Sequence, residues 1–264
     1  MRQEAYFCTV EELNRLGKEN IPQQFISHTH LIYSSPATLA FNSPGAEGFG
    51  VKRAGLAVPD SIMLIVSPGC CGRNTSVLSS MRAYQDRFYY LLMDETDIVT
   101  GRHLKKIPKA VAEICEGLKK KPSVVMICIT CVDALLGTDM ERVCHKAEEY
   151  AGVPVRPCYM YALTREGRKP PMVHVRQSVY SLLEPKKKKG NVVNLLGYFS
   201  PLTDDCELYD LLHGAGVKTI HEISRCKDYA QYQTMSEANF NLVLHPEARF
   251  AAEDFHDRLK IPYI

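Results

Sequence analysis

From about residue 60 onward, short apolar runs rich in β-branched residues alternate with amphipathic helical patterns. Runs such as 124–129 (VVMICI) carry no polar position, as expected of a strand buried on both faces of a sheet. Strands that alternate with helices predict βαβ units and a parallel sheet. We therefore predict the α/β class, with Rossmann-like parallel sheets flanked by helices.

The same patterns locate the individual elements. Strands are predicted at 61–66, 89–93, 123–130, 153–160, 191–197, 217–222, 240–245 and 261–264. Amphipathic helices are predicted near 105–121, 134–151, 172–183, 206–215 and 248–259. A short helix over 10–18 is predicted because Thr9 and Glu12 have the spacing of a capping box.

Lysines 186–189 mark a boundary between Pro185 and Gly190. Like charges repel one another and resist burial, which favours a solvated linker over a patch for phosphate or a partner. We predict a first domain over 1–185, which carries the candidate cysteines, and a smaller Rossmann-like domain over 190–264. The chain ends on the strand pattern IPYI, which suits either a complete protein or a truncated one.

Charge and hydropathy exclude several classes of function. The chain has 264 residues and a net charge of +2, which predicts neither nucleic acid nor a membrane surface as a partner. Its apolar runs are too short to span a bilayer, and the N-terminus lacks the apolar stretch of a secretory signal, so we predict a cytoplasmic protein. No GxGxxG follows a strand, so nothing indicates NAD or flavin.

Cysteine is the informative residue type, with ten in the chain. Cys70 and Cys71 follow the first predicted strand after a Ser-Pro-Gly turn, and Cys131 directly follows the strand at 123–130. Ligands of open parallel sheets bind at the carboxyl ends of the strands, so these cysteines are expected to converge. Their thiolates suit iron or zinc. Two or three thiolates do not complete a four-coordinate site, which points to a symmetric partner for the rest.

Other interpretations of the cysteines remain open. Cys128 and Cys131 form a CxxC, the spacing of a structural zinc site or a redox dithiol, but no second CxxC follows. Cys128 lies inside an apolar strand, which favours a buried side chain. Core packing is also the expectation for the cysteines in other helical or strand patterns, namely Cys115, Cys144, Cys158, Cys206 and Cys226.

Four segments resemble the nitrogenase component 1 family. LIVSPGCCG, around Cys70, resembles that family's HGPxGC segment, and DETDIVTGRHLKKIPKAV is similar to its DIVFGG…KL segment. ITCVDALLGTDMERV, around Cys131, resembles its cluster-ligand motif (T/E)C…IGDD. NVVNLLG and the final FNLVLHPEARFAAEDFHDRLKIPYI resemble its second domain. The resemblance runs from about residue 60 to the C-terminus.

This resemblance implies two domains of the nitrogenase component 1 fold and an oxidoreductase with an iron–sulfur cluster of the 4Fe–4S type. Cys70 and Cys131 match two cluster ligands of the family, and a homodimer would supply four. Cys71 is either a replacement ligand or a bystander. The family's earlier cysteine is missing here, and Glu47 is a candidate oxygen ligand in its place. Where cofactor-bearing members have a cysteine after LNLV, this chain has His245, a candidate iron ligand or a surface residue.

The function implied is acceptance of electrons from a separate ATP-dependent iron–sulfur reductase and their delivery to an unidentified substrate. Nitrogen reduction is disfavoured, because the family's third domain is absent and one cofactor ligand is changed. The alternative is a non-catalytic scaffold that assembles an iron–sulfur cluster or metallocofactor. A plain α/β domain with core cysteines is the remaining hypothesis.

Overall fold

The structure, a computed structural model, describes residues 9–17, 20, 51–69, 82–130, 132, 136–160 and 169–264. The chain groups into two compact units, Met1–Ser43 and Pro44–Ile264. In the first, α1 spans Val10–Leu16. The Thr9 N–H donates to Glu12 Oε2 (2.7 Å) and the Glu12 N–H donates to Thr9 Oγ1 (3.2 Å), which confirms the predicted capping box.

The larger unit contains a four-stranded parallel sheet, sheet A, with the order β2-β1-β3-β4. Its strands are β1 (Ile62–Ser67), β2 (Phe88–Leu92), β3 (Val125–Ile129) and β4 (Val155–Tyr159). Every residue of β1 and β3 is buried, whereas the edge strand β2 alternates between buried and exposed positions. This is the burial that continuous apolar runs predict for central strands.

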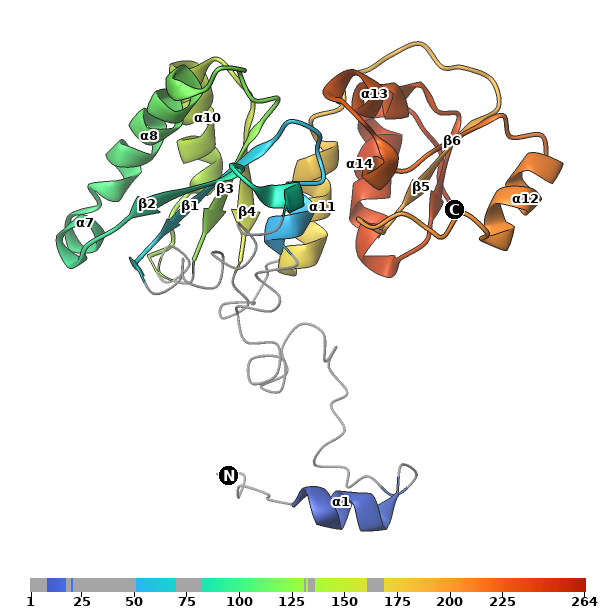
Figure 1. Ribbon diagram of the computed structural model, residues 1–264, viewed down its shortest axis with the longest axis horizontal. Coiled ribbons are helices and arrows are strands. Elements are labelled where there is room, and N and C mark those ends of the chain that lie inside the picture. Colours follow the sequence, from blue (N-terminus) through green and yellow to red (C-terminus); the bar gives the residue numbers. More distant parts are fainter. Residues whose placement is uncertain are drawn as a thin grey trace. The chain divides into compact units, whose positions relative to one another are not determined.

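Helices cover both faces of sheet A (Figure 1). On one face α8 (His103–Gly117) and α10 (Met140–Ala151) pack on Leu64 and Ile127. On the other face α11 (Pro171–Tyr180) and segment 51–58 pack on Met63 and Met126. The shorter elements of this half are η3 (Arg82–Tyr84) and α7 (Glu95–Thr100).

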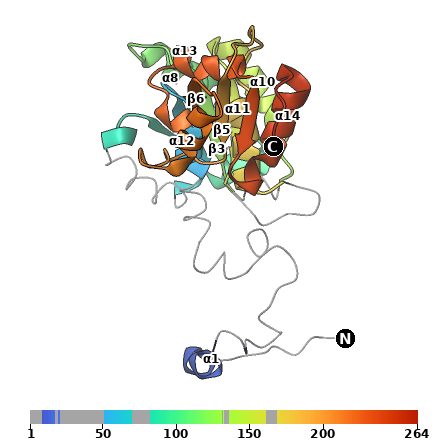
Figure 2. The same cartoon turned by 90° about the vertical axis from the view of Figure 1, so that its right-hand side faces the viewer.

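A second parallel sheet, sheet B, has the order β6-β5-β7. Its strands are β5 (Val192–Leu196), β6 (Thr219–His221) and β7 (Phe240–Val243). Instead of the strand predicted at 261–264, the structure has an isolated parallel bridge between Asn241 and Tyr263. The helices are α12 (Glu207–Gly214), η4 (Ile223–Arg225), α13 (Tyr229–Gln233), η5 (Thr234–Glu237), η6 (Pro246–Ala248) and α14 (Arg249–Leu259). Figure 2 shows sheet B with α12 on its outer side.

A continuous core joins the two sheets through α11 and α14, which lie side by side in Figure 1. The rings of Tyr180 and Phe255 pack at 5.2 Å between the two helices. Two lysines of the run 186–189 contact the rest of the protein, unlike those of a fully solvated linker. Lys188 Nζ donates to the Ser236 carbonyl (2.8 Å), and Lys189 forms an ion pair with Glu237. The predicted boundary between 185 and 190 stays a prediction.

The architecture confirms the α/β class, with parallel sheets flanked by helices. Among the predicted helices, α10 differs at its start, since it begins at Met140 rather than at 134. In the described ranges, no helix combines the length and apolar character needed to cross a membrane.

Candidate functional site

The carboxyl edge of sheet A is the first candidate site. β1 and β3 are neighbours with Val66 beside Ile129, so the next positions, Ser67 and Thr130, are adjacent on two parallel strands. The predicted ligands Cys70 and Cys131 follow in the sequence by three residues and one residue. These two cysteines, together with Cys71 and Glu47, lie outside the described residues.

Ser67 and Thr130 are buried polar residues that the sequence analysis did not single out. They are 0% and 1% exposed, and neither hydroxyl has a hydrogen-bond partner in the described part of the chain. Side chains alternate along a strand, so both hydroxyls lie on the face that carries Met63 and Met126. The signal available in the sequence is a hydroxyl residue that ends an apolar strand shortly before a cysteine.

The cysteines within the sheet are core residues. Cys128 is fully buried in β3, as predicted, and lies beside the equally buried Cys158 of β4. Burial raises the pKa of the Cys158 thiol well above its ordinary value, and Cys128 adds to this while Lys52 opposes it. The Cys158 thiol therefore suits packing better than coordination, which requires a thiolate, and Cys128 is a core residue by its burial.

The remaining described cysteines divide into two groups. Cys115 and Cys144 are buried, as predicted, and burial is the main cause that raises the pKa of each thiol. Cys206 and Cys226 are only partly buried, because they precede α12 and follow η4 instead of lying inside an element. Among the described side chains, no group of three or more His, Cys, Asp or Glu is arranged to hold a metal ion.

The carboxyl edge of sheet B brings β5 and β7 into close contact. A Cβ on Gly197, which has φ +135°, would lie 2.8 Å from the Cβ and the backbone nitrogen of His245, so only glycine fits. His245 is partly exposed, and its Nδ1 accepts from the Glu247 N–H at 3.3 Å. One ring nitrogen of His245, Nδ1, therefore has a partner within the protein. From the sequence, this histidine was a candidate iron ligand or a surface residue.

A buried ion pair lies beneath this edge and was also missed by the sequence analysis. Arg176 of α11 donates through Nε and Nη2 to the Gly197 carbonyl (3.0 and 2.7 Å), and its Nη1 pairs with Glu247 Oε2 at 2.8 Å. The two side chains are 5% and 9% exposed. No spacing in the sequence signals this pair, because the partners are far apart along the chain.

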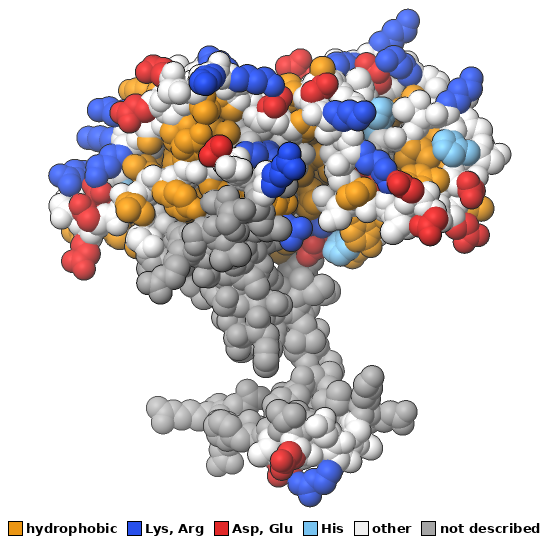
Figure 3. Space-filling model, in the orientation of Figure 1, with side chains coloured by type: hydrophobic (Ala, Val, Ile, Leu, Met, Phe, Trp, Pro, Cys, Tyr) orange, Lys and Arg blue, Asp and Glu red, His pale blue; other side chains and the backbone are white. Residues whose placement is uncertain are grey.

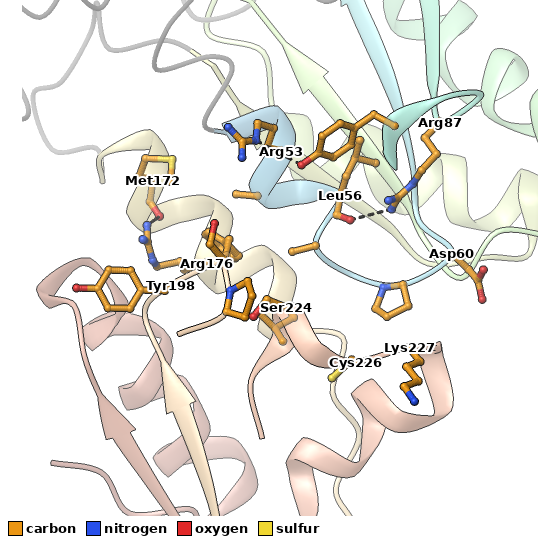
Figure 4. A pocket seen from close by; sticks show the side chains of 18 residues that line it. Arg53, Leu56, Asp60, Arg87, Met172, Arg176, Tyr198, Ser224, Cys226 and Lys227 are labelled. Carbon is orange, nitrogen blue, oxygen red and sulfur yellow. Dashed lines mark hydrogen bonds between the residues drawn. The ribbon is translucent and has the colours of Figure 1, made fainter. Parts of the chain in front are cut away.

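A pocket of about 640 Å³ opens between segment 53–60 and the loops that follow β5 and β6 (Figure 4). Arg87 and Arg176 line this pocket, but both guanidinium groups already have partners in the protein. Arg87 donates to the carbonyls of Leu56 (2.8 Å) and Ser61 (2.9 Å) and to Ser61 Oγ (2.8 Å). These two arginines therefore hold the fold together and have little capacity for a ligand, whereas Arg53, which also lines the pocket, is exposed and donates through Nε to the Tyr84 hydroxyl at 3.3 Å.

A second pocket, of about 630 Å³, lies beside α7 and the N-terminus of α10, on the side of sheet A where the strands end. Val99 and Leu136 line it and are 84% and 49% exposed. Its basic side chains, Lys105, Arg142 and Lys146, are exposed and have no ion-pair partner within the described ranges. Apolar side chains also reach the surface along the β2 edge of this sheet, where Leu92 is 60% exposed (Figure 3).

Comparisons with curated proteins find relatives in cofactor biosynthesis. The nitrogenase iron-molybdenum cofactor biosynthesis protein NifE of Nostoc sp. is 26% identical over 216 residues, which are 78% of this chain and 44% of that protein. NifE of Rhodobacter capsulatus is 26% identical over 235 residues, 84% of this chain and 49% of that protein. The chain thus spans about half the length of the curated relatives it matches.

The solved structures and the family model agree with these relatives. A structure of nitrogenase Cp1 at pH 6.5 superposes with a TM-score of 0.61 at 17% identity, over 81% of this chain and 52% of that chain. It shows the same fold. The family model for nitrogenase component 1 type oxidoreductases matches residues 47–264. The chain belongs to the nitrogenase component 1 type oxidoreductase family.

Proposed function

We propose that this chain holds an iron–sulfur cluster at the carboxyl edge of sheet A through Cys70 and Cys131, and that it serves in metallocofactor assembly. The observation that carries the cluster proposal is that β1 and β3 are neighbouring strands. In the sequence, Cys70 follows the end of β1 and Cys131 follows the end of β3. Parallel sheets bind ligands at this edge.

The residues present there fit such a group. Ser67 and Thr130 supply two buried hydroxyls without partners in the described part of the chain, which is the chemistry that sulfur acceptors would satisfy. The neighbouring side chains on the same face of the sheet, Ile65 and Cys128, are buried core residues. A dry, apolar surround with few donors suits a cluster ligated by thiolates.

Two thiolates from each of two chains complete a four-iron cluster, so we infer a homodimer that shares it. A bound cluster supplies one-electron redox chemistry. Cys128 and Cys158 take no part in ligation, since both are fully buried core residues in adjacent strands, and burial raises the pKa of the Cys158 thiol.

The role in assembly is supported by the names of the curated relatives, which are iron-molybdenum cofactor biosynthesis proteins. In that role the metal cluster is cargo, built or held on the chain and passed to an acceptor protein. Arg87 and Arg176 would then keep the fold rigid, because their donors are committed to protein oxygens.

Electron transfer to a substrate is the second candidate function, favoured by the family's description as oxidoreductases. It requires a reductase partner near the cluster edge. The pocket beside α7 suits such a partner, because exposed Val99 and Leu136 lie among Lys105, Arg142 and Lys146. We propose this surface as the docking site of an iron–sulfur reductase with an acidic face.

The first experiment measures iron and acid-labile sulfide per chain after anaerobic purification, with the mass in solution. We expect about two irons per chain in a dimer, as a shared four-iron cluster requires. Cys70→Ala and Cys131→Ala are expected to lose the iron, because each removes a ligand. Cys128→Ala and the partly exposed Cys206→Ala are the matched controls and keep it. Full iron in Cys131→Ala, or none in the wild-type chain, would refute the cluster proposal.

A second experiment separates the two roles. The loaded protein is mixed with an acceptor apoprotein and, separately, with an ATP-dependent iron–sulfur reductase. Transfer of ⁵⁷Fe to the acceptor without ATP-dependent redox cycling supports assembly. Cycling without transfer, weakened by Lys105→Glu and Arg142→Glu, supports electron transfer.

A further inference from the structure

Two buried hydroxyls lie side by side at the end of sheet A, and no described residue gives either of them a hydrogen-bond partner. Ser67 ends β1, Thr130 follows β3, and the preceding pair, Val66 and Ile129, are register partners. Neither Ser67 Oγ nor Thr130 Oγ1 has a hydrogen-bond partner in the parts of the chain that are described. Both residues lie on the same face of the sheet.

Within the described part of the chain this arrangement is unfavourable. Leaving a buried hydroxyl unpaired lowers the folding equilibrium constant by about tenfold. The opposite end of β1 shows the usual solution: Ser61 is equally buried, on the same face, and its Oγ accepts from Arg87 Nη2 at 2.8 Å. Serine on this strand is therefore paired at the amino edge, whereas at the carboxyl edge no described residue pairs with it.

The unpaired end coincides with the edge at which the cluster is proposed to bind. Thr130 directly precedes Cys131, and Ser67 lies three residues before Cys70. The neighbouring side chains on this face, Ile65 and Cys128, offer no strong acceptor for the hydroxyl protons. Thiolate and sulfide sulfurs are acceptors that a cluster would bring to this place.

We propose that Ser67 and Thr130 donate hydrogen bonds to the sulfur atoms of the bound cluster and thereby raise its reduction potential. The inference rests on the proposed cluster function and adds two residues to it. Hydrogen bonds to cluster sulfurs stabilise the reduced form, which carries one more negative charge. The stability lost in the cluster-free chain is then recovered on loading.

The test in the loaded protein is a redox titration of Ser67→Ala and Thr130→Val, with iron measured in each sample. We expect full iron, and a reduction equilibrium constant lowered by about tenfold in each variant, a shift of about 59 mV for one electron. Thr130→Ser keeps the hydroxyl and is expected to keep the wild-type potential. An unchanged potential at full iron overturns the inference and leaves the cluster proposal intact.

The second measurement uses the cluster-free full chain. Here the same variants are expected to raise the measured quantity, the midpoint of urea unfolding, whereas they lower the reduction potential of the loaded protein. Removing an unpaired hydroxyl is stabilising, so Ser67→Ala and Thr130→Val are expected to raise the midpoint of urea unfolding. Ser61→Ala, the matched control, is expected to lower it because Arg87 loses an acceptor. A lower midpoint for both edge variants, or loss of iron from either, overturns the inference. Absence of iron from the wild-type chain removes the cluster proposal and this inference with it.

Discussion

At the scale of single residues, burial decides which titratable groups stay neutral. His174 of α11 packs edge-on against the Tyr159 ring with centroids 4.3 Å apart, and its Nδ1 lies 3.3 Å from Ser178 Oγ. Burial, together with a smaller contribution from the charge of Lys169, lowers the pKa of this imidazole from 6.5 to about 4. His174 is therefore a structural group that resists protonation in the folded protein.

A pH-dependent stability follows from His174. Between pH 6.5 and about 4 the unfolded chain binds a proton that the folded chain does not, so the free energy of unfolding falls as the pH falls. The full loss from this group is about 3 kcal/mol. We expect His174→Gln to remove this part of the pH dependence, measured by urea unfolding across the window. Equal slopes for the variant and the wild-type chain would contradict this prediction.

At the scale of elements, apolar patterning predicted the strands well and the short helices poorly. Each strand of sheet A is a run of apolar residues, and such runs are visible because both faces of the sheet are covered. α7 was not predicted because Asp97 is its only buried residue, so it has no apolar period. Its available signal was the capping box formed by Asp94 and Asp97.

The start of α10 is set by a polar cap. Asp139 Oδ1 accepts from the Arg142 N–H at 3.1 Å, which explains why the helix begins at Met140. We expect Asp139→Ala to lower the free energy of unfolding by about 1 kcal/mol, measured in urea. Asp205→Ala, at an exposed position with no cap bond, is the control and is expected to change it by less than about 0.5 kcal/mol. Equal effects would argue against the cap.

At the scale of the whole larger unit, a few polar side chains tie the two sheets together through α11 and α14. Arg176 reaches from α11 to the end of β5 and to η6, and Arg258 of α14 donates to the carbonyls of Tyr180 (3.0 Å) and Leu183. Because these bonds cross the predicted domain boundary, we expect the two sheets to unfold in one transition.

The Arg176–Glu247 pair tests this coupling. Glu247→Ala leaves a buried guanidinium without its counter-charge, and we expect a loss of about 3–5 kcal/mol in urea unfolding. The matched control is Glu253→Ala, which breaks the exposed Arg249 pair (72% and 34% exposed) and is expected to change stability by less than about 0.5 kcal/mol. A small effect of Glu247→Ala would show that water already solvates Arg176.

The sequence by itself determined the class of the fold, most of its strands and the family. Burial on both faces of a parallel sheet requires continuous apolar runs, and the cysteine motifs that resemble the family follow those runs directly. It also identified Cys128 as a core residue for the same reason. Only the tertiary structure decided which strand ends are neighbours, and so placed Ser67 beside Thr130 and joined Arg176 to Glu247. Sheet order and helix packing determine such pairs. The two partners are far apart along the chain, so no periodic pattern in the sequence indicates that they meet.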